Sequence, residues 1–379
     1  MRILLLMSQS SPWSLSVASS LHNAGHKIHV VAWSVEETKS YSVVPAAEAA
    51  AVLNAFASFS TVHKPSIVLL RVLRMTIAVR RLSRSISPDI VVCMYGGVFG
   101  FAAFLSGVRP YAVSAVGSDV LRRSVIGKLL NKLIFGCASI VLANGRHIAK
   151  NVLIQAPGAN VTNLLIGLDT NKFRPGPESV VPRFYSHRTF DKIYNNEAII
   201  RALSQIPESA PNFEFIFSAG GPELRDAREL ADKMLPEAIH HRVKFLGGGL
   251  TTEELAQQLG TSDFFVSMSF SDGTSTCLLE ALSCGLFPVL SDIPANSDLF
   301  NELKLAGTLV CLHDGARLTG ALLDCIQNTS EYRDQAKQNR AKIVKKCDST
   351  VGRRILAELL SKEVLRYSRE CNTRCPNRS

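Results

Sequence analysis

Two carboxylates, Asp272 and Glu280, lie in a stretch almost free of other charges, because Glu280 is the only charged residue between Gly273 and Ser291. The apolar residues 264–266 predict a buried strand, which a glycine-containing turn connects to a helix predicted over residues 274–283. A helix start with glycine and small hydroxyl residues offers free N–H groups, which bind phosphate. Two carboxylates beside such a helix start suit the hydroxyl groups of a nucleotide sugar, with the ribose on one side and the sugar on the other.

The predicted helix gives Glu280 no polar face. Leucines occupy one side of the helix, and cysteine and alanine occupy another. A helix that is apolar all round is buried, and a carboxylate inside it needs strong hydrogen-bond donors. Glu280 could equally cap a neighbouring backbone segment or pair with a distant arginine. The position of Asp272 in the preceding turn favours ligand binding.

Strand and helix patterns alternate along nearly the whole chain, which predicts an α/β protein with parallel sheets. A length of 379 residues favours two domains, and we place the boundary after Arg174. The loop after the first predicted strand, residues 3–7, lacks the G-x-G-x-x-G fingerprint. This absence argues against a dehydrogenase.

The amino-acid composition indicates the general type of protein and its cellular compartment. Hydrophobic residues make up 46% of the chain and charged residues 20%, which is typical of a globular protein. Nine cysteines stand at irregular spacings and complete no metal-binding pattern with histidines. The apolar run at residues 3–7 is too short for a secretory signal. We therefore expect reduced thiols, no bound metal and a cytoplasmic protein.

Residues 90–108 carry no charge over a length that could span a bilayer. They include four glycines and follow Pro88 and Asp89 as a parallel strand would. We interpret them as a strand, a glycine loop and a short helix.

Residues 67–86 predict a basic amphipathic helix. Its apolar arc contains Val72, Met75, Val79, Leu82 and Ile86. Leu73 and Ile77 lie among arginines on the opposite arc. Mixed cations and aliphatics indicate an interfacial membrane surface, although an ordinary exposed helix with two stray apolar residues explains the pattern as well.

Basic residues are concentrated in the first half of the chain. The first 175 residues hold 18 Lys and Arg against 6 Asp and Glu, whereas the remainder holds 24 against 26. Such an excess predicts an anionic partner, which could be nucleic acid, a phospholipid surface or a phosphorylated substrate. No nucleic-acid motif and no interleaved aromatic residues accompany the basic residues, so we expect no nucleic-acid partner.

The second half of the chain resembles the retaining glycosyltransferases of the GT-B fold, specifically glycosyltransferase family 4. The D-x7-E pattern from Asp272 to Glu280 is similar to the acidic pair E-x7-E of that family. Further similar segments follow in the family's order: Gly167-Leu168-Asp169 to Phe173-Arg174-Pro175, Ala219-Gly220-Gly221-Pro222, Val243-Lys244-Phe245-Leu246-Gly247, and Leu279-Glu280-Ala281 with Gly285 and Pro288-Val289. These segments lie within residues 160–300, and the N-terminal half agrees only in its alternating pattern.

The resemblance implies two Rossmann-like parallel-sheet domains that face a cleft. Residues 1–174 would bind the acceptor and residues 175–348 the nucleotide sugar. A helix at 349–371 would cross back to the N-terminal domain, and a disordered tail would follow at 372–379.

The resemblance also implies roles for individual residues. Glu280 would bind the ribose hydroxyls, Asp272 the transferred sugar, and Arg188 and Lys192 the diphosphate. Donor-binding positions would be Gly220, Gly221, Leu246, Gly247, Gly273, Thr274, Ser275 and Thr276. No metal or cofactor is implied, because cations and helix amides stabilise the leaving diphosphate.

Three features depart from the family pattern. Asp272 is shorter than the usual glutamate, which changes its reach to the sugar. Lys192 is one residue closer to Arg188 than usual and is followed by Ile193 rather than glycine, so both residues could be ordinary surface side chains. Gly117, Ser118 and Asp119 stand where relatives have an acceptor-side histidine. Asp119 could position an acceptor hydroxyl or cap the helix that begins near Val120.

The sequence therefore predicts a metal-independent hexosyltransferase that uses a nucleoside-diphosphate sugar. The acceptor would be a saccharide or lipid-linked intermediate of a cell-surface glycan, such as lipopolysaccharide, O-antigen or exopolysaccharide. The protein would be cytoplasmic and peripheral on the inner face of the membrane. An epimerase-like enzyme of the same fold and a basic nucleic-acid-binding protein are the alternatives.

Overall fold

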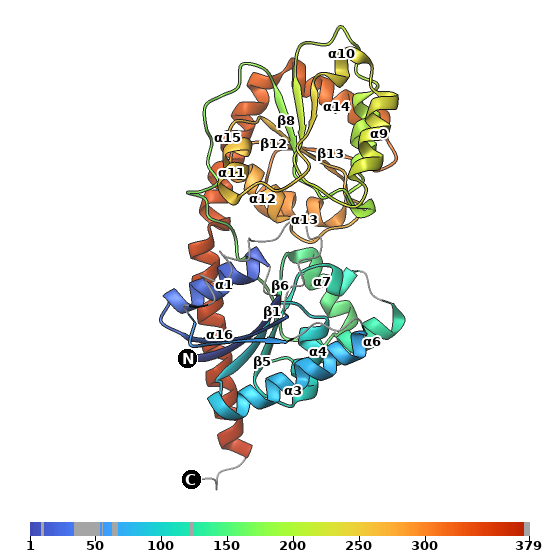
Figure 1. Ribbon diagram of the computed structural model, residues 1–379. Coiled ribbons are helices and arrows are strands. Elements are labelled where there is room, and N and C mark those ends of the chain that lie inside the picture. The colour runs from blue at the N-terminus through green and yellow to red at the C-terminus, as the bar shows by residue number, and fades with distance from the viewer. Residues whose placement is uncertain (9–10, 34–53, 55, 63–66, 122–123, 375–379) are drawn as a thin grey trace. The chain divides into compact units, whose positions relative to one another are not determined.

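A computed structural model describes residues 1–8, 11–33, 54, 56–62, 67–121 and 124–374 (Figure 1). They form two compact units, each built on one parallel β-sheet. The first unit holds the described residues up to Ile166 and again from Val351, and the second holds Gly167–Thr350. The division falls before the boundary that the sequence suggested after Arg174. One reason is that Leu168 donates a backbone hydrogen bond of 3.0 Å to Cys347, inside the second unit.

The sheet of the first unit has the strand order β3-β2-β1-β4-β5-β6-β7. Its strands are β1 (Arg2–Ser8), β2 (Lys27–Trp33), β3 (Ser58–Val62), β4 (Ile90–Cys93), β5 (Tyr111–Ala115), β6 (Ile140–Ala143) and β7 (Val161–Asn163). The direction in which successive strands are added reverses between β1 and β4. In open parallel sheets, ligands bind beyond the carboxyl ends of the strands at such a switch point.

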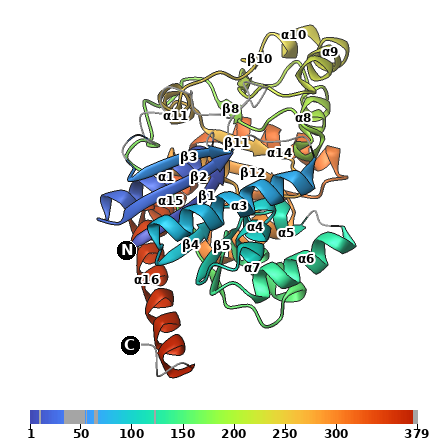
Figure 2. The same ribbon diagram turned by 60° about the horizontal axis from the view of Figure 1, so that its bottom comes forward.

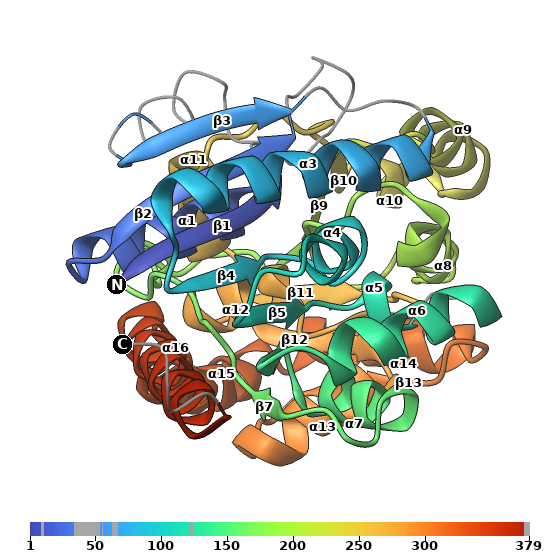
Figure 3. The same cartoon turned by 90° about the horizontal axis from the view of Figure 1, so that it is seen from below.

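Helices cover both faces of this sheet, because alternate strand residues point to opposite sides. Ile3 and Leu5 pack with α1 (Pro12–Asn23) and with α16 (Ser349–Arg374). Leu4 and Leu6 belong to the cluster on the other face. That face is covered by α3 (Val68–Ile86), α4 (Val98–Ser106), α5 (Ser118–Leu121), α6 (Val125–Gly136) and α7 (Arg146–Gln155). Figure 3 shows α3, α4 and α6 in succession on this side.

The two segments that the sequence related to membranes, residues 90–108 and 67–86, both belong to the first unit. Residues 90–108 form β4, a glycine loop and α4, as predicted. Among the described residues, no helix is long and apolar enough to cross a membrane. The basic helix is α3, which buries Val72, Met75 and Val79 as the wheel predicts.

The C-terminal helix α16 packs on the first unit, as expected for a helix that crosses back. Its residues Leu356 and Leu360 are fully buried in the core beside β1. The helix continues to Arg374, so residues 372–374 are helical rather than part of a disordered tail. The rest of that predicted tail, residues 375–379, lies outside the described residues.

The sheet of the second unit has the strand order β10-β9-β8-β11-β12-β13. The direction in which successive strands are added to the sheet reverses between β8 and β11. Its strands are β8 (Arg183–Ser186), β9 (Glu214–Phe217), β10 (Val243–Phe245), β11 (Phe264–Ser267), β12 (Phe287–Ser291) and β13 (Thr308–Val310). The helices are η1 (Lys192–Tyr194), α8 (Asn196–Leu203), α9 (Leu224–Met234), α10 (Glu237–His240), α11 (Thr252–Gly260), α12 (Thr276–Ser283), α13 (Pro294–Leu303), α14 (Gly315–Gln327) and α15 (Thr329–Cys347).

Phenylalanines fill the core of the second unit. Phe184, Phe215 and Phe264, from three neighbouring strands, stack with ring centroids 4.7 to 5.9 Å apart. Both faces of the sheet are covered by helices, so its strands are almost continuously apolar rather than alternating. This rigid sheet positions the loops that follow its strands.

Candidate functional site

Two of the site residues predicted from the sequence lie close together at the switch point of the second sheet. Strands β8 and β11 are neighbours, with Phe264 paired to Phe184. Arg188 lies in the loop that follows β8, and Asp272 lies in the loop that follows β11. Both therefore stand beyond the carboxyl edge of the sheet, at the position where open parallel sheets bind ligands.

Arg188 is the centre of this cluster. Its side chain is only 6% exposed, and its guanidinium donates hydrogen bonds of 2.6 Å to a carboxylate oxygen of Asp272 and to the hydroxyl of Ser275. The Tyr194 ring lies beneath it, 4.1 Å from the guanidinium carbon. Burial alone lowers the pKa of Arg188, but the Asp272 carboxylate raises it overall, so the guanidinium stays positively charged. Its buried Nε has no acceptor among the described residues.

Glu280 lies in the middle of α12, and its side chain is half-buried. No described residue donates a hydrogen bond to its carboxylate, which excludes the backbone cap and the direct arginine pair that were alternatives. Burial raises the pKa of Glu280 to about 8, and the nearby positive charge of Arg188 opposes this rise. The carboxylate therefore lacks protein partners and is destabilised in its ionised form.

Helix α12 begins at Thr276, later than the predicted start at Thr274. Ser275 is its N-cap, and the Ser275 hydroxyl accepts from the backbone N–H of Leu278 at 3.3 Å. The Ser275 hydroxyl thus holds the helix start and Arg188 together. The remaining N–H groups of the first turn have no partners within the helix, and they carry its positive dipole end.

Lys192 does not join the cluster by any direct contact. It is exposed in the short helix η1, and no described residue accepts a hydrogen bond or forms an ion pair with its ammonium group. The sequence predicted the same role for Arg188 and Lys192. In the structure, Arg188 is buried and paired with Asp272, whereas Lys192 is exposed.

Two glycine loops flank the cluster. Gly220 and Gly221 follow β9, and the Gly220 carbonyl accepts a hydrogen bond of 2.9 Å from the Phe190 backbone. Leu246 and Gly247 follow β10, and Leu246 is 42% exposed. These residues are at the same carboxyl edge as Arg188, because β10, β9 and β8 are parallel neighbours.

Replacing Gly221 by alanine is expected to lower the stability of the second unit by about 2–3 kcal/mol. The glycine has φ +152°, and an added Cβ would lie 2.5 Å from the Phe190 backbone nitrogen. Gly320→Ala is the control, because Gly320 is helical with open space around it, and alanine favours a helix. Thermal unfolding distinguishes the two variants. Equal melting temperatures would contradict this account.

The sequence missed three residues beside Arg188: Tyr194, His187 and Cys277. Burial lowers the pKa of His187 to about 4, and its ring nitrogen is 2.7 Å from the Ser218 hydroxyl. Burial raises the pKa of Cys277 to about 11, so its thiol stays protonated. Only their proximity in sequence to Arg188 and Glu280 could have indicated them.

Asp119 lies in the first unit, in the first turn of the short helix α5. It is fully buried, and its carboxylate accepts backbone hydrogen bonds from Gly96 at 2.8 Å, Gly117 at 2.8 Å and Val116 at 3.1 Å. Burial raises its pKa, which these hydrogen bonds oppose. Asp119 therefore ties the loop after β4 to the loop after β5 at the start of α5, and a role in positioning an acceptor hydroxyl stays a prediction.

Ser118 is the exposed member of the predicted acceptor-side residues, whereas Gly117 is buried. The Ser118 hydroxyl lies 2.8 Å from the Tyr95 hydroxyl. Tyr95 follows β4 at the switch point of the first sheet, and the sequence did not single it out. The paired hydroxyls of Tyr95 and Ser118 are polar groups at that edge.

The site has no metal-binding arrangement within the part of the chain that the structure describes. No group of three or more His, Cys, Asp and Glu side chains is placed there to hold a metal ion.

Two family models match the chain. One, described as glycosyl transferases group 1, covers residues 170–342, and the other, described as glycosyl transferase 4-like, covers residues 2–140. The first includes Arg188, Asp272 and Glu280.

Solved structures are similar over nearly the whole length of the chain. Sucrose-phosphate synthase from Thermosynechococcus elongatus is similar with a TM-score of 0.79 and 13% identity, over 96% of this chain and 99% of that one. HepE of Anabaena, solved in complex with UDP-glucose, is similar with a TM-score of 0.75 and 17% identity, over 96% and 100% of the two chains. At these identities the likeness shows the fold.

One curated relative is the gpi3 subunit of phosphatidylinositol N-acetylglucosaminyltransferase from Schizosaccharomyces pombe. It is 22% identical over 129 residues, which are 33% of this chain and 27% of that protein. The match thus spans about a quarter of the relative's length.

Proposed function

We propose that this chain, which belongs to the glycosyl transferases group 1 with the GT-B fold, moves a sugar from a nucleoside-diphosphate sugar to a hydroxyl acceptor. The glycosyltransferase class rests on the family models and on the fold. The donor, the acceptor, retention of the anomeric configuration and independence of metal ions are the proposed parts. HepE and its complex with UDP-glucose support a nucleotide-sugar donor.

The single observation that carries the proposal is the Glu280 carboxylate. It is half-buried and has no hydrogen-bond donor among the described residues, and burial raises its pKa to about 8. A carboxylate in that state gains most from a ligand with two adjacent hydroxyls, since buried polar groups need partners. The ribose of a nucleotide supplies such a pair.

Arg188 suits the diphosphate that leaves. When the bond between the anomeric carbon and the diphosphate oxygen breaks, negative charge builds on that oxygen. The positively charged Arg188 and the N–H groups at the start of α12 are hydrogen-bond donors held in place to stabilise this charge. The acceptor oxygen bonds to the anomeric carbon, and its hydroxyl proton passes to a diphosphate oxygen. Asp272 then contacts sugar hydroxyls while its other oxygen keeps Arg188 in place.

The acceptor is proposed to be a lipid-linked or polysaccharide intermediate of a cell-surface glycan, reached from the cytoplasmic face of the membrane. The excess of basic residues in the first half of the chain supports an anionic acceptor. The gpi3 relative, whose name gives phosphatidylinositol as its acceptor, supports a lipid in that role. Tyr95 and Ser118 are the hydroxyls we propose to contact the acceptor.

A thermal-shift panel of nucleoside diphosphates and their sugars tests the donor. A ligand at 100 times its dissociation constant is expected to stabilise the protein by about 2.7 kcal/mol. Incubation with the donor alone and with an acceptor then separates transfer from epimerisation by product analysis. Stabilisation by none of the nucleoside diphosphates, or conversion of the donor without any acceptor as the main reaction, would refute the proposal.

A further inference from the structure

The first half of α3 exposes large apolar side chains. Leu69 is 73% exposed, Leu73 is 52% exposed and Ile77 is 43% exposed. Ile67, Val68 and Leu70 before and between them are exposed as well. The opposite side of α3 buries Val72, Met75 and Val79 in the core, so the exposed set is a second apolar face.

Helix α6 has a similar exposed stripe, which the sequence analysis did not identify. Val125 is 77% exposed, Ile126 is 72%, Leu129 is 60% and Leu133 is 47%. Positions 125, 129 and 133 recur at the spacing that places side chains on one face of a helix. Asn131, Ile134 and Phe135 occupy the buried face.

Both stripes lie on the same side and near the same edge of the first sheet. Helices α3 and α6 cover one face, with α4 between them (Figure 2). A helix that leads into the next parallel strand runs back from the carboxyl edge to the amino edge. The exposed apolar residues lie in the first half of α3, and the most exposed ones of α6, Val125 and Ile126, stand at its start. They are therefore near the carboxyl edge, where Tyr95 and Ser118 also lie.

Unpaired cations surround these apolar residues. Arg74, Arg81 and Arg84 are exposed on α3, and Lys128 and Lys132 are exposed on α6. Neither helix contains an acidic residue. Within the described ranges, no carboxylate pairs with any of these five side chains. By contrast, Glu358, Glu363 and Glu370 of α16, on the other face of the sheet, pair with arginines of their own helix.

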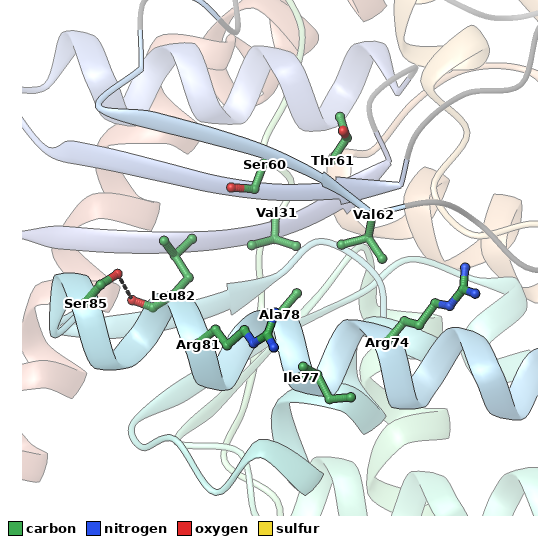
Figure 4. Close-up of a pocket in the computed structure, with 10 residues that line it drawn as sticks. All are labelled: Val31, Ser60, Thr61, Val62, Arg74, Ile77, Ala78, Arg81, Leu82 and Ser85. Atoms are coloured by element: carbon green, nitrogen blue, oxygen red, sulfur yellow. Dashed lines mark hydrogen bonds between the residues drawn. The ribbon is translucent and has the colours of Figure 1, made fainter.

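A groove beside α3 shows how cations and apolar groups alternate on this surface. It has a volume of about 530 Å³ and lies between α3 and β3 (Figure 4). Val62, Ala78 and Leu82 contribute apolar lining, and Arg74 and Arg81 line it from α3. An anionic headgroup over apolar carbon chains matches this combination.

We propose that the exposed faces of α3 and α6 form one docking surface for an anionic phospholipid bilayer. An interfacial helix buries aliphatic side chains at the boundary between headgroups and acyl chains while its cations attract anionic lipids. A second copy of this chain fits poorly, because the same cations would face one another. Nucleic acid fits poorly because aliphatic side chains offer bases no stacking platform.

Docking through α3 and α6 would bring the enzyme close to a lipid-linked acceptor. Only this advantage rests on the proposed function. The surface can exist without the transfer reaction. Vesicle binding and nucleoside-diphosphate binding therefore serve as separate measurements.

Co-sedimentation with vesicles tests the surface. The full chain is expected to bind vesicles of phosphatidylcholine with phosphatidylglycerol at low salt, and to bind phosphatidylcholine vesicles or high-salt samples weakly. Leu73→Asp with Leu129→Asp, and separately Arg74→Glu with Arg81→Glu, should each lower vesicle affinity on the order of ten-fold or more. These side chains are exposed, so the melting temperature and nucleoside-diphosphate binding should remain unchanged.

Leu365→Asp with Arg369→Glu is the matched control. Both residues are exposed on α16, and Leu365 is 59% exposed, on a helix of the opposite sheet face. The control should bind vesicles like the wild type. The proposal is wrong if the wild type ignores anionic vesicles, or if the control loses as much affinity as the helix variants. It is also wrong if light scattering shows a dimer that the Leu73 and Leu129 changes dissociate while vesicles are not bound.

Discussion

Glu280→Gln is expected to lower kcat/KM for sugar transfer on the order of 100-fold or more. Glutamine keeps the size of the side chain but removes a charged acceptor, and each hydrogen bond to a charged group contributes about 1.5–3 kcal/mol. The wild-type carboxylate has no described protein partner to lose, so the change should leave the fold intact. Initial rates with a nucleoside-diphosphate sugar measure the effect.

The control for this variant is Glu237→Gln, an exposed carboxylate of the same unit. It should transfer at the wild-type rate. If Glu280→Gln also turns over normally while binding its donor as tightly, Glu280 has no role in the donor site and the assignment fails.

The raised pKa of Glu280 predicts a second, independent result for the same variant. Burial raises the pKa to about 8, against 4.5 for the unperturbed side chain. Between these values the folded protein holds a proton that the unfolded chain has lost, so the free energy of unfolding falls as the pH rises through that range. Ribose hydroxyls stabilise the ionised form, so donor binding should release a proton and tighten as the pH approaches 8.

Glu280→Gln should abolish both pH dependences and should raise the melting temperature of the ligand-free protein above neutral pH. Calorimetry in buffers of different ionisation enthalpy counts the released proton. Donor affinity that is flat with pH in the wild type, or unchanged pH dependence in the variant, contradicts this role.

Arg188→Lys is expected to lower kcat about 100- to 1000-fold, which is typical for the loss of a fixed donor to developing charge. Lysine keeps the positive charge but loses the planar fork that contacts Asp272 and Ser275 together. Affinity for the nucleoside diphosphate should fall more than affinity for the nucleoside, because the lost contact is to phosphate.

Arg242→Lys is the matched control for that change. Arg242 also lies over an aromatic ring, 5.3 Å from the centroid of Phe213, and donates to backbone carbonyls away from the switch point. It should leave kcat unchanged. If Arg188 only stabilised the fold, Arg188→Lys would lower the melting temperature while the ratio of diphosphate to nucleoside affinity stayed the same.

Much of the architecture follows from local pattern. Alternating strand and helix signals predicted two parallel-sheet domains, and the glycines of residues 90–108 correctly separated β4 from α4. Helix α15 was not predicted, because its few apolar positions are interrupted by polar residues such as the buried Asn339, whose amide accepts a hydrogen bond from the backbone of Ala306.

The site was only partly predictable. Spacing within one segment indicated Asp272 and Glu280, but the pairing of Asp272 with Arg188 depends on β8 and β11 being neighbours, which strand order decides. The hydrogen bonds of Asp119 could not be predicted, because its partners, Gly96 and Gly117, come from two different loops. Long-range neighbours of this kind leave no local signal.

The placement of α16 has a consequence for how the chain folds during synthesis. Leu356 and Leu360 complete the core beside β1, although β1 is translated more than 300 residues before them. Domains commonly fold in order from the N-terminus as they emerge. Here the second unit can finish first, while the part of the apolar sheet face that α1 leaves open stays exposed until α16 leaves the ribosome. We expect a chaperone to bind the nascent protein at this apolar surface.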